Sequence, residues 1–427
     1  MPTAYLETYG CAANQSDSEI MAGLLGRAGW AVLTDEKIAT KADLLILNTC
    51  TVKAPTEQRV LFRIAELSKL KKPLVVTGCL AQTQPERIRA LAPKASIVGT
   101  HAITNIAKIA PRVLAGQHVE ELGEGAPKVC VPKMRRNPVI DIVQINQGCA
   151  SHCNFCGTKA ARGDLLSYPL EEIAKEVAAA KAAGCREFWL TSQDCGAYGL
   201  DNGTNLAHLL KEITDKIKGK YCLRVGMANP TFVKTYLNEL IEAYQHPNVF
   251  KFLHIPAQSG SDKVLSDMKR GHTAADVIKI VKESRKSFPE IQIWTDIIVG
   301  YPTETDDDFL ASIRLIDEIK PDYVNVSRFG SRPRTEAARL KPLATEVLKD
   351  RSRRMSAVCR EIALEQNKKW LGWSGPVLVD EFNAEKQSWI GRNFAYKPIV
   401  LKTRQNIGET ADVKIVAAGS VLLGHQI

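Results

Sequence analysis

Residues 146–156, which read NQGCASHCNFC, decide the fold of this chain. They place three thiols, Cys149, Cys153 and Cys156, on one short loop with the spacing C-x3-C-x2-C. Thiolates gathered on a short loop are the ligands that a [4Fe–4S] cluster uses. Because three ligands for four irons leave one iron open to another molecule, the loop favours a catalytic cluster over one that only stores electrons.

The alternative metal for such a loop is zinc. A structural zinc site joins one C-x2-C pair to a second pair of Cys or His ligands, which completes a tetrahedron. His152 lies inside the loop, but no second pair follows it nearby. The spacing therefore favours the iron–sulfur cluster.

The loop also resembles the signature of the radical S-adenosylmethionine (SAM) enzymes, C-x3-C-x-aromatic-C. The resemblance implies that Cys149, Cys153 and Cys156 hold the cluster and that Phe155 packs near the adenine of SAM. In those enzymes the open iron chelates SAM, and reduction of the cluster breaks a C–S bond of SAM. The 5′-deoxyadenosyl radical that forms removes hydrogen from an unactivated carbon.

The composition is that of a soluble globular chain, with 45% hydrophobic and 24% charged residues. A length of 427 residues is enough for two to four domains. The apolar runs are far shorter than the ~20 residues of a membrane span, and the N-terminus has no signal-peptide pattern. The odd number of cysteines, 11, favours metal binding or catalysis over disulfides. We therefore expect a cytoplasmic protein with no membrane partner.

The net charge of +10 suggests an anionic partner, nucleic acid first, although many basic proteins bind nothing acidic. A basic helical stretch follows Arg328 and includes Arg332 and Arg334, which we expect to contact RNA. The alternative is that this stretch is only a solvated helix face.

Residues 1–115 alternate short strands and helices, which predicts a Rossmann-like parallel sheet. Three strand-forming runs each end in a cysteine, at Cys11, Cys50 and Cys79. Because the carboxyl ends of parallel strands lie at one edge, we expect these three thiols to converge and to hold a second [4Fe–4S] cluster. The alternative is three unrelated core thiols, since free cysteine is often buried.

Residues 116–138, rich in glycine, proline and basic residues, are expected to form a linker. Residues 139–365 then repeat a strand–helix rhythm. The expected strands are 139–145, 188–191, 222–227, 250–254, 292–299 and 323–326, and the expected helices are 205–217, 231–245, 274–286 and 306–319. This pattern predicts a TIM-like βα-barrel, whole or partial, with its strand ends at one mouth. Polar loops follow several of these strands, so we expect the SAM cleft there.

Residues 366–427 change to short alternating strands, expected at 376–380, 388–391, 399–402 and 411–416. About sixty residues of this kind predict a small closed or nearly closed β-barrel of the oligonucleotide-binding type. Trp389 and Tyr396 interleave with Arg392 and Lys397, a pattern that suits stacking and clamping of RNA. We therefore expect Arg392 and Lys397 to contact RNA.

The whole chain resembles one family, the methylthiotransferases, in its order of modules and in three motifs. The motifs are HIPAQSGS at 254–261, MKRGHT at 268–273 and DIIVGYP at 296–302. The resemblance implies that the C-terminal module is a TRAM domain, associated with tRNA binding. It also implies an auxiliary cluster, held here by Cys11, Cys50 and Cys79, which carries sulfur that SAM methylates. Two SAM molecules are then consumed for each methylthio group transferred to the substrate carbon.

Two further stretches, YGCAANQSDSE at 9–19 and SQDCGAYG at 192–199, resemble the archaeal and eukaryotic branch of the family. That branch methylthiolates carbon 2 of N6-threonylcarbamoyladenosine, at position 37 beside the tRNA anticodon. The implied partners are the anticodon stem-loop of tRNA, an electron donor and a sulfur source. The alternatives are methylthiolation of isopentenyladenosine in tRNA or of an aspartate in a ribosomal protein, and a non-catalytic iron–sulfur RNA-binding protein.

The resemblance also implies where SAM binds. The residues expected to contact SAM are Phe155, Gln193, Arg224, Asn229, Gln258, Ser259 and Ile298. The four polar residues from Arg224 onward have the alternative of serving only the structure of the barrel rim.

The chain departs from the family pattern at Gly157, Asp164, Leu166 and Cys195, which leaves the cluster ligands intact but puts the shape of the substrate mouth in question. Five cysteines have no expected role and are interpreted as core or incidental thiols: Cys130, Cys185, Cys195, Cys222 and Cys359.

Two cysteine replacements separate the two clusters. Cys149→Ala is expected to abolish SAM cleavage because it removes a ligand of the radical-generating cluster. Cys50→Ala is expected to leave reductive SAM cleavage in place while stopping sulfur transfer. Both are measured by mass spectrometry, as 5′-deoxyadenosine and as methylthiolated nucleoside. Continued methylthiolation by the Cys50→Ala protein would contradict the auxiliary role.

Overall fold

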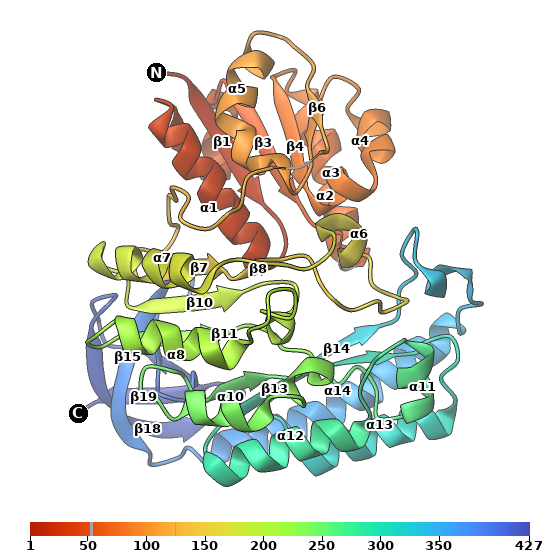
Figure 1. The fold of residues 1–427 in the computed structure, drawn as a ribbon, viewed down its shortest axis with the longest axis vertical. Coiled ribbons are helices and arrows are strands. Elements are labelled where there is room, and N and C mark those ends of the chain that lie inside the picture. Colours follow the sequence, from red (N-terminus) through yellow and green to blue (C-terminus); the bar gives the residue numbers. More distant parts are fainter. Residues whose placement is uncertain (52–53, 124) are drawn as a thin grey trace.

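The computed structural model describes residues 1–51, 54–123 and 125–427. Figure 1 shows three parts: an N-terminal sheet with its helices, a central set of parallel strands, and a C-terminal barrel packed beside the central strands. This confirms the expected multidomain α/β architecture. Among the described residues, no helix combines the length and apolar character that crossing a membrane requires.

The N-terminal sheet is wholly parallel, in the strand order β2-β1-β3-β4-β5-β6. Its strands are β1 (Thr3–Thr8), β2 (Ala31–Leu33), β3 (Leu44–Thr49), β4 (Leu74–Gly78), β5 (Ser96–Val98) and β6 (Glu120–Glu121). The last strand lies beyond residue 115, so the sheet extends into the stretch expected to be a linker.

Helices cover both faces of this sheet (Figure 1). They are α1 (Ala12–Arg27), α2 (Ala54–Lys69), α3 (Cys79–Thr83), α4 (Pro85–Leu91) and α5 (Ile106–Leu114), with short 3-10 turns η1 (Glu36–Lys41) and η2 (Ala102–Asn105). Apolar side chains of α1 and α5 pack on one face, and those of α2 and α4 pack on the other. The central strand β3 is therefore buried at every position, as in other doubly covered parallel sheets.

A cysteine of the N-terminal triad (Cys11, Cys50 and Cys79) follows the end of each of the strands β1, β3 and β4. Cys79 begins α3 directly after Gly78, whose φ is +91°. A Cβ atom at Gly78 would lie 2.5 Å from the carbonyl oxygen of Thr49, so only glycine permits this sharp strand-to-helix turn. The turn places Cys79 at the sheet edge and buries it.

The central part holds six parallel strands in two sheets, ordered β11-β10-β7 and β12-β13-β14. Their bounds are β7 (Ile140–Gln144), β10 (Glu187–Thr191), β11 (Cys222–Val225), β12 (Phe252–His254), β13 (Gln292–Val299) and β14 (Tyr323–Arg328). A parallel bridge between Leu223 and Val249 joins the two sheets. In the part of the chain that the structure describes, β7 and β14 are not paired with each other, so the expected barrel is a partial one.

Helices cover the outer side of these strands (Figure 1). They are α7 (Leu170–Ala182), α8 (Leu206–Lys216), α9 (Pro230–Val233), α10 (Leu237–Tyr244), α12 (Ala274–Ser287), α13 (Asp306–Ile319) and α14 (Thr345–Lys368). Two short helices lie elsewhere: α6 (Thr158–Arg162) packs on α3 of the N-terminal part, and α11 (Asp262–Asp267) contributes Val264 to a separate small core cluster. Shorter elements are η3 (Cys195–Ala197), η4 (Glu336–Arg339) and the two-residue strands β8 (Asn146–Gln147) and β9 (Leu166–Ser167). The helix expected over 231–245 is broken into α9 and α10.

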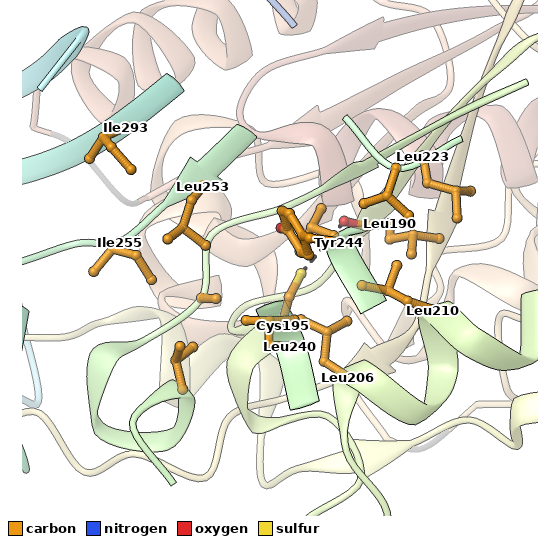
Figure 2. Close-up of a cluster of buried hydrophobic side chains, with 14 of the residues drawn as sticks. Leu190, Cys195, Leu206, Leu210, Leu223, Leu240, Tyr244, Leu253, Ile255 and Ile293 are labelled. Carbon is orange, nitrogen blue, oxygen red and sulfur yellow. Dashed lines mark hydrogen bonds between the residues drawn. The ribbon is translucent and has the colours of Figure 1, made fainter. Parts of the chain in front are cut away.

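Figure 2 shows the core between the strands and these helices, where Cys195 lies among leucine side chains and Tyr244. The Cys195 sulfur is 3.5 Å from the carbonyl oxygen of Leu190. Cys195 is therefore a core thiol. Among the other cysteines without an expected role, Cys185 and Cys359 are buried and Cys130 is exposed.

The C-terminal part is a closed barrel with the order β15-β16-β17-β19-β18. Its strands are β15 (Ser374–Asn383), β16 (Ser388–Arg392), β17 (Pro398–Leu401), β18 (Thr410–Ala418) and β19 (Leu422–Gln426). The last strand was not expected from the sequence, and it is the one that closes the barrel, because it pairs with both β17 and β18.

The barrel is joined to the central strands by buried polar groups. Arg392 Nε lies 2.6 Å from Asp380 Oδ2, and both groups lie beside the fully buried Glu187 of β10. Burial, together with the neighbouring Asp380 carboxylate, raises the pKa of Glu187 to about 8. Glu187 therefore keeps its proton at neutral pH in the folded protein.

The protonated Glu187 makes stability depend on pH. The unfolded chain releases this proton near the ordinary glutamate pKa of 4.5, whereas the folded chain holds it up to about 8. The contribution of Glu187 to the free energy of unfolding is therefore fully present below the unfolded pKa and is lost as the pH rises through the folded pKa. Glu187→Gln is expected to flatten this fall, measured by urea unfolding across that pH range.

The matched control is Glu290→Gln, which alters an exposed glutamate and is expected to leave the pH dependence unchanged. An unaltered fall in the Glu187→Gln protein would contradict the assignment.

Candidate functional site

A cavity of about 760 Å³ opens at the carboxyl ends of the central strands. The cysteine loop forms one wall, through Cys149, Cys153 and Cys156. The opposite walls come from the residues that follow β10, β11 and β12, from β13 and β14, and from α14. Pro55 of the N-terminal part also lines the cavity, so it lies where two modules meet.

The cysteine loop is held against the segment that carries the MKRGHT motif. Asn154 N–H donates to the carbonyl oxygen of Met268 at 3.2 Å. Arg270 Nη1 donates to Cys153 Sγ at 3.3 Å, and its Nη2 donates to Asn229 Oδ1 at 2.9 Å. Arg270 was not expected to be a site residue, although its place inside a quoted motif was an available signal.

The chemistry of the donor set fits an iron–sulfur cluster. Among the described residues, no three His, Cys, Asp or Glu side chains are close enough to hold a single metal ion. A [4Fe–4S] cluster allows its ligands to lie farther apart than a single metal ion does, because each thiolate binds a different iron. The three thiols therefore need only face one cavity. Burial raises the pKa of Cys149 to about 11, so loading iron would displace a proton from this thiol.

Five of the residues expected to contact SAM line the cavity: Phe155, Gln193, Asn229, Gln258 and Ile298. Asn229 Nδ2 donates to Ser151 Oγ at 3.0 Å, which connects it to the cysteine loop. Gln193 Oε1 and Arg270 Nε are buried without hydrogen-bond partners among the described residues. An acceptor and a donor left open in this way suit a polar ligand such as the amino acid end of SAM.

Arg224 and Ser259 do not line the cavity. The Arg224 guanidinium lies over the ring of Phe252, 5.0 Å from its centroid, and over Tyr396 of the barrel, at 5.5 Å. Ser259 is fully buried, and its Oγ lies 3.3 Å from Ser312 Oγ. Both positions agree with the alternative that these residues serve the structure of the barrel rim. A motif residue can take such a position because neighbouring residues of a strand or turn point in opposite directions.

Asp194 is a buried cavity residue that follows β10 in one of the polar loops expected to form the SAM cleft, although it was given no role of its own. Its Oδ1 accepts from the backbone N–H of Gly196 and of Asn229, at 3.0 and 2.9 Å. Burial raises the pKa of Asp194 to about 6. This carboxylate fixes the turn after β10 and the start of α9 relative to each other.

The cysteines of the N-terminal triad lie together around Asn14. The sulfurs of Cys11 and Cys79 are 3.9 and 3.8 Å from Asn14 Oδ1. Cys50 is adjacent, since a Cβ atom added at Gly10 would lie 2.9 Å from the Cβ of Cys50 and from Asn14 Nδ2. The predicted convergence of three strand ends is therefore present in the structure.

The four residues expected to contact RNA divide into two pairs. Arg332 lines the cavity and Arg334 is exposed next to it. Arg392 and Lys397 instead lie in the interface between the barrel and the central strands, where Lys397 Nζ is 2.9 Å from Asp322 Oδ1. Lys397 is buried and ion-paired, so its charge is not available to RNA in this structure. Arg392 is likewise paired, with the buried Asp380.

Of the four departures from the family pattern, Gly157 lines the cavity, whereas Cys195 is the core thiol described above. A Cβ atom at Gly157 would meet only the Arg332 side chain, at 3.7 Å, so glycine leaves this part of the mouth open. Asp164 forms an exposed ion pair with Lys159 at 2.7 Å, and Leu166 is half exposed.

Comparison with known proteins agrees with this geometry. Residues 3–99 match the family described as "Uncharacterized protein family UPF0004", and residues 143–316 match the radical SAM superfamily. A [4Fe–4S] cluster and SAM are the cofactors that this superfamily implies.

Solved structures share the fold at low sequence identity. The radical SAM methyltransferase TsrM from Kitasatospora setae, solved with cobalamin and a [4Fe–4S] cluster, has a TM-score of 0.59 at 16% identity, over 79% of this chain and 74% of TsrM. The cobalamin-dependent SAM radical enzyme OxsB has a TM-score of 0.55 at 13% identity, over 84% of this chain and 56% of OxsB. These similarities show the fold alone.

Curated relatives match nearly the whole chain. A probable threonylcarbamoyladenosine tRNA methylthiotransferase of Methanothermobacter thermautotrophicus is 42% identical over 93% of both chains. One of Pyrococcus abyssi is 40% identical over 99% of both chains. The threonylcarbamoyladenosine tRNA methylthiotransferase of Homo sapiens is 36% identical over 99% of this chain and 73% of its own length. The chain therefore belongs to the threonylcarbamoyladenosine tRNA methylthiotransferases, a family of radical SAM transferases.

Proposed function

We propose that this protein methylthiolates carbon 2 of N6-threonylcarbamoyladenosine at position 37 of tRNA. The observation that carries the proposal is the placement of two cysteine triads at facing edges of two parallel sheets. Helix α6, which follows Cys156, packs on α3, which begins at Cys79. A cavity lined by the expected SAM contacts opens beside them.

The six cysteines divide into two ligand sets. Cys149, Cys153 and Cys156 would hold the radical-generating cluster, and Cys11, Cys50 and Cys79 would hold a second, auxiliary cluster. When bound, the two clusters and SAM supply a carbon-centred radical and the methylthio group. The chain itself contributes the six thiols, the polar groups of Asn229 and Gln193 that orient the ligand, and walls that keep water from the radical.

Arg332 is suited to recognising the threonylcarbamoyl group, which carries a carboxylate. Its Nη1 lies 3.5 Å from Glu57 Oε2, a loose ion pair, whereas Arg87 already holds the other oxygen of Glu57 at 2.6 Å. The guanidinium therefore has donors to spare at the cavity wall, and Gly157 leaves the space beside it open. Arginine binds a carboxylate through two parallel hydrogen bonds.

The three modules take separate tasks in this proposal. Residues 1–115, with the strand that follows them, carry the auxiliary cluster, and residues 139–365 carry the radical SAM site. Residues 116–138 connect the two. Residues 366–427 form the TRAM domain, which would approach the anticodon stem-loop of tRNA. An electron donor, a sulfur source and a cytoplasmic location complete the proposal.

The test is mass spectrometry of nucleosides from tRNA incubated anaerobically with reconstituted protein, SAM, a sulfide source and a reductant. The tRNA should carry either threonylcarbamoyladenosine or isopentenyladenosine. A gain of one methylthio group on the threonylcarbamoyl nucleoside alone is the expected result. A methylthio group on the isopentenyl nucleoside would contradict the proposed substrate. Formation of 5′-deoxyadenosine without methylthiolation of either nucleoside would contradict the proposed reaction.

The role of Arg332 has its own test. Arg332→Gln is expected to lower methylthiolation of the threonylcarbamoyl nucleoside by roughly tenfold or more, since a hydrogen bond to a charged group contributes about 1.5–3 kcal/mol. The yield of 5′-deoxyadenosine from SAM alone should stay within about twofold of the parent. Arg314→Gln, which alters an exposed arginine of α13, is the control. Equal methylthiolation by the Arg332→Gln and control proteins would exclude the contact.

A further inference from the structure

A network of buried charges lies directly behind the N-terminal cysteine triad. Arg162 Nη1 is 2.7 Å from Asp17 Oδ2, and Lys128 Nζ is 2.7 Å from Asp17 Oδ1. The three side chains are 1%, 0% and 0% exposed for Arg162, Lys128 and Asp17. Two cations share one anion, so the network holds an excess of one positive charge away from water.

Asn14 connects this network to the sulfurs. Its Nδ2 donates to the carbonyl oxygens of Tyr9 and Thr49, at 2.9 and 2.8 Å, which fixes the orientation of the amide. Its Oδ1 therefore faces the sulfurs of Cys11 and Cys79, and it accepts from Arg162 Nη2 at 2.7 Å. The guanidinium and the two sulfurs meet at the same oxygen atom.

A buried positive charge without a matching anion is costly, so the excess charge calls for a negative group nearby. A [4Fe–4S] cluster on Cys11, Cys50 and Cys79 would supply one through its thiolates and sulfides. The other ionisable side chains around the network do not: His101 is held largely neutral, because burial and then the charges of Lys128 and Arg162 lower its pKa.

We propose that Arg162 is a positioning residue for the auxiliary cluster, with its guanidinium compensating the negative charge of that cluster. The inference rests on the proposed function, which places a cluster on the N-terminal triad. Arg162 ends α6, the helix that follows Cys156, so the segment that carries the radical-generating triad also sets the charge beside the other triad. A positive charge at this place favours the reduced, more negative state of the cluster and raises its reduction potential.

The experiment isolates the auxiliary cluster in the full chain. In the parent protein Cys149, Cys153 and Cys156 are all replaced by alanine, so that iron can be held only by the N-terminal triad. After anaerobic reconstitution, iron per chain is determined, and the reduction potential is measured by a titration followed by electron paramagnetic resonance. Arg162→Gln is added to this parent, as is Asp17→Asn in a separate protein.

The two variants are expected to move the potential in opposite directions. Arg162→Gln removes a positive charge and should lower the reduction potential of the cluster. The expected shift is about 59 mV for one electron, which corresponds to about a tenfold decrease in the equilibrium constant for reduction. Asp17→Asn removes the negative charge and should raise the potential. The fold is expected to persist in the first variant because Lys128 still pairs with Asp17.

Arg351→Gln is the matched control, since Arg351 is also buried and paired with a buried carboxylate, Glu304, but does not line the cavity. The inference is overturned if the potential in both variants equals that of the control, or if both shift in the same direction. A parent protein that binds no iron would instead overturn the auxiliary cluster itself, and the role of Arg162 with it.

Discussion

The ion pairs of Asp17 with Arg162 and Lys128 are the interaction on which the arrangement of the whole molecule depends. Burial alone would raise the pKa of Asp17, but Arg162 and Lys128 outweigh that effect and lower it. Removing such charges from water costs several kcal/mol per ion, which is offset only when all partners are in place. Because the partners come from α1, from the stretch before β7 and from α6, these ion pairs form only when the N-terminal part and the central part pack together. Gln144 of β7 adds a hydrogen bond to Asp17 at 2.9 Å.

The convergence of cysteines followed from the sequence because it needs only one rule. Strands that are parallel bring their carboxyl ends to one edge, so a cysteine after each strand must approach the others. The rule places Cys11, Cys50 and Cys79 without any knowledge of side-chain packing. Arg162, by contrast, belongs to the central part of the chain and contacts Asn14 and Asp17 beside the N-terminal triad. No local sequence pattern predicts a contact between residues so far apart in the chain.

Residues whose role depends on the direction of a side chain were harder to predict. The C-terminal barrel has aromatic and basic residues in alternation, which describes a surface that binds RNA and a surface that packs on another module equally well. In the structure Lys397 pairs with Asp322 of the central part, and Arg392 pairs with Asp380 of the barrel beside Glu187 of β10. Arg224 and Ser259 lie outside the cavity lining for a related reason, since a motif gives the position of a residue but not the face on which its side chain lies. The strands β6 and β19 were missed because two to five residues near a turn carry little periodicity.

The contacts of Arg224 with Phe252 and Tyr396 also determine how the barrel is carried. Together with the ion pair of Lys397, they attach the barrel to the central strands at several separate points. A domain attached at several separate points does not rotate relative to the central strands. The distance from the outer surface of the barrel to the cavity is therefore constant. An RNA that touched both would be measured against that distance. If the barrel holds the stem of the tRNA, as proposed above, this constant distance would restrict which nucleotide of that RNA reaches the cavity.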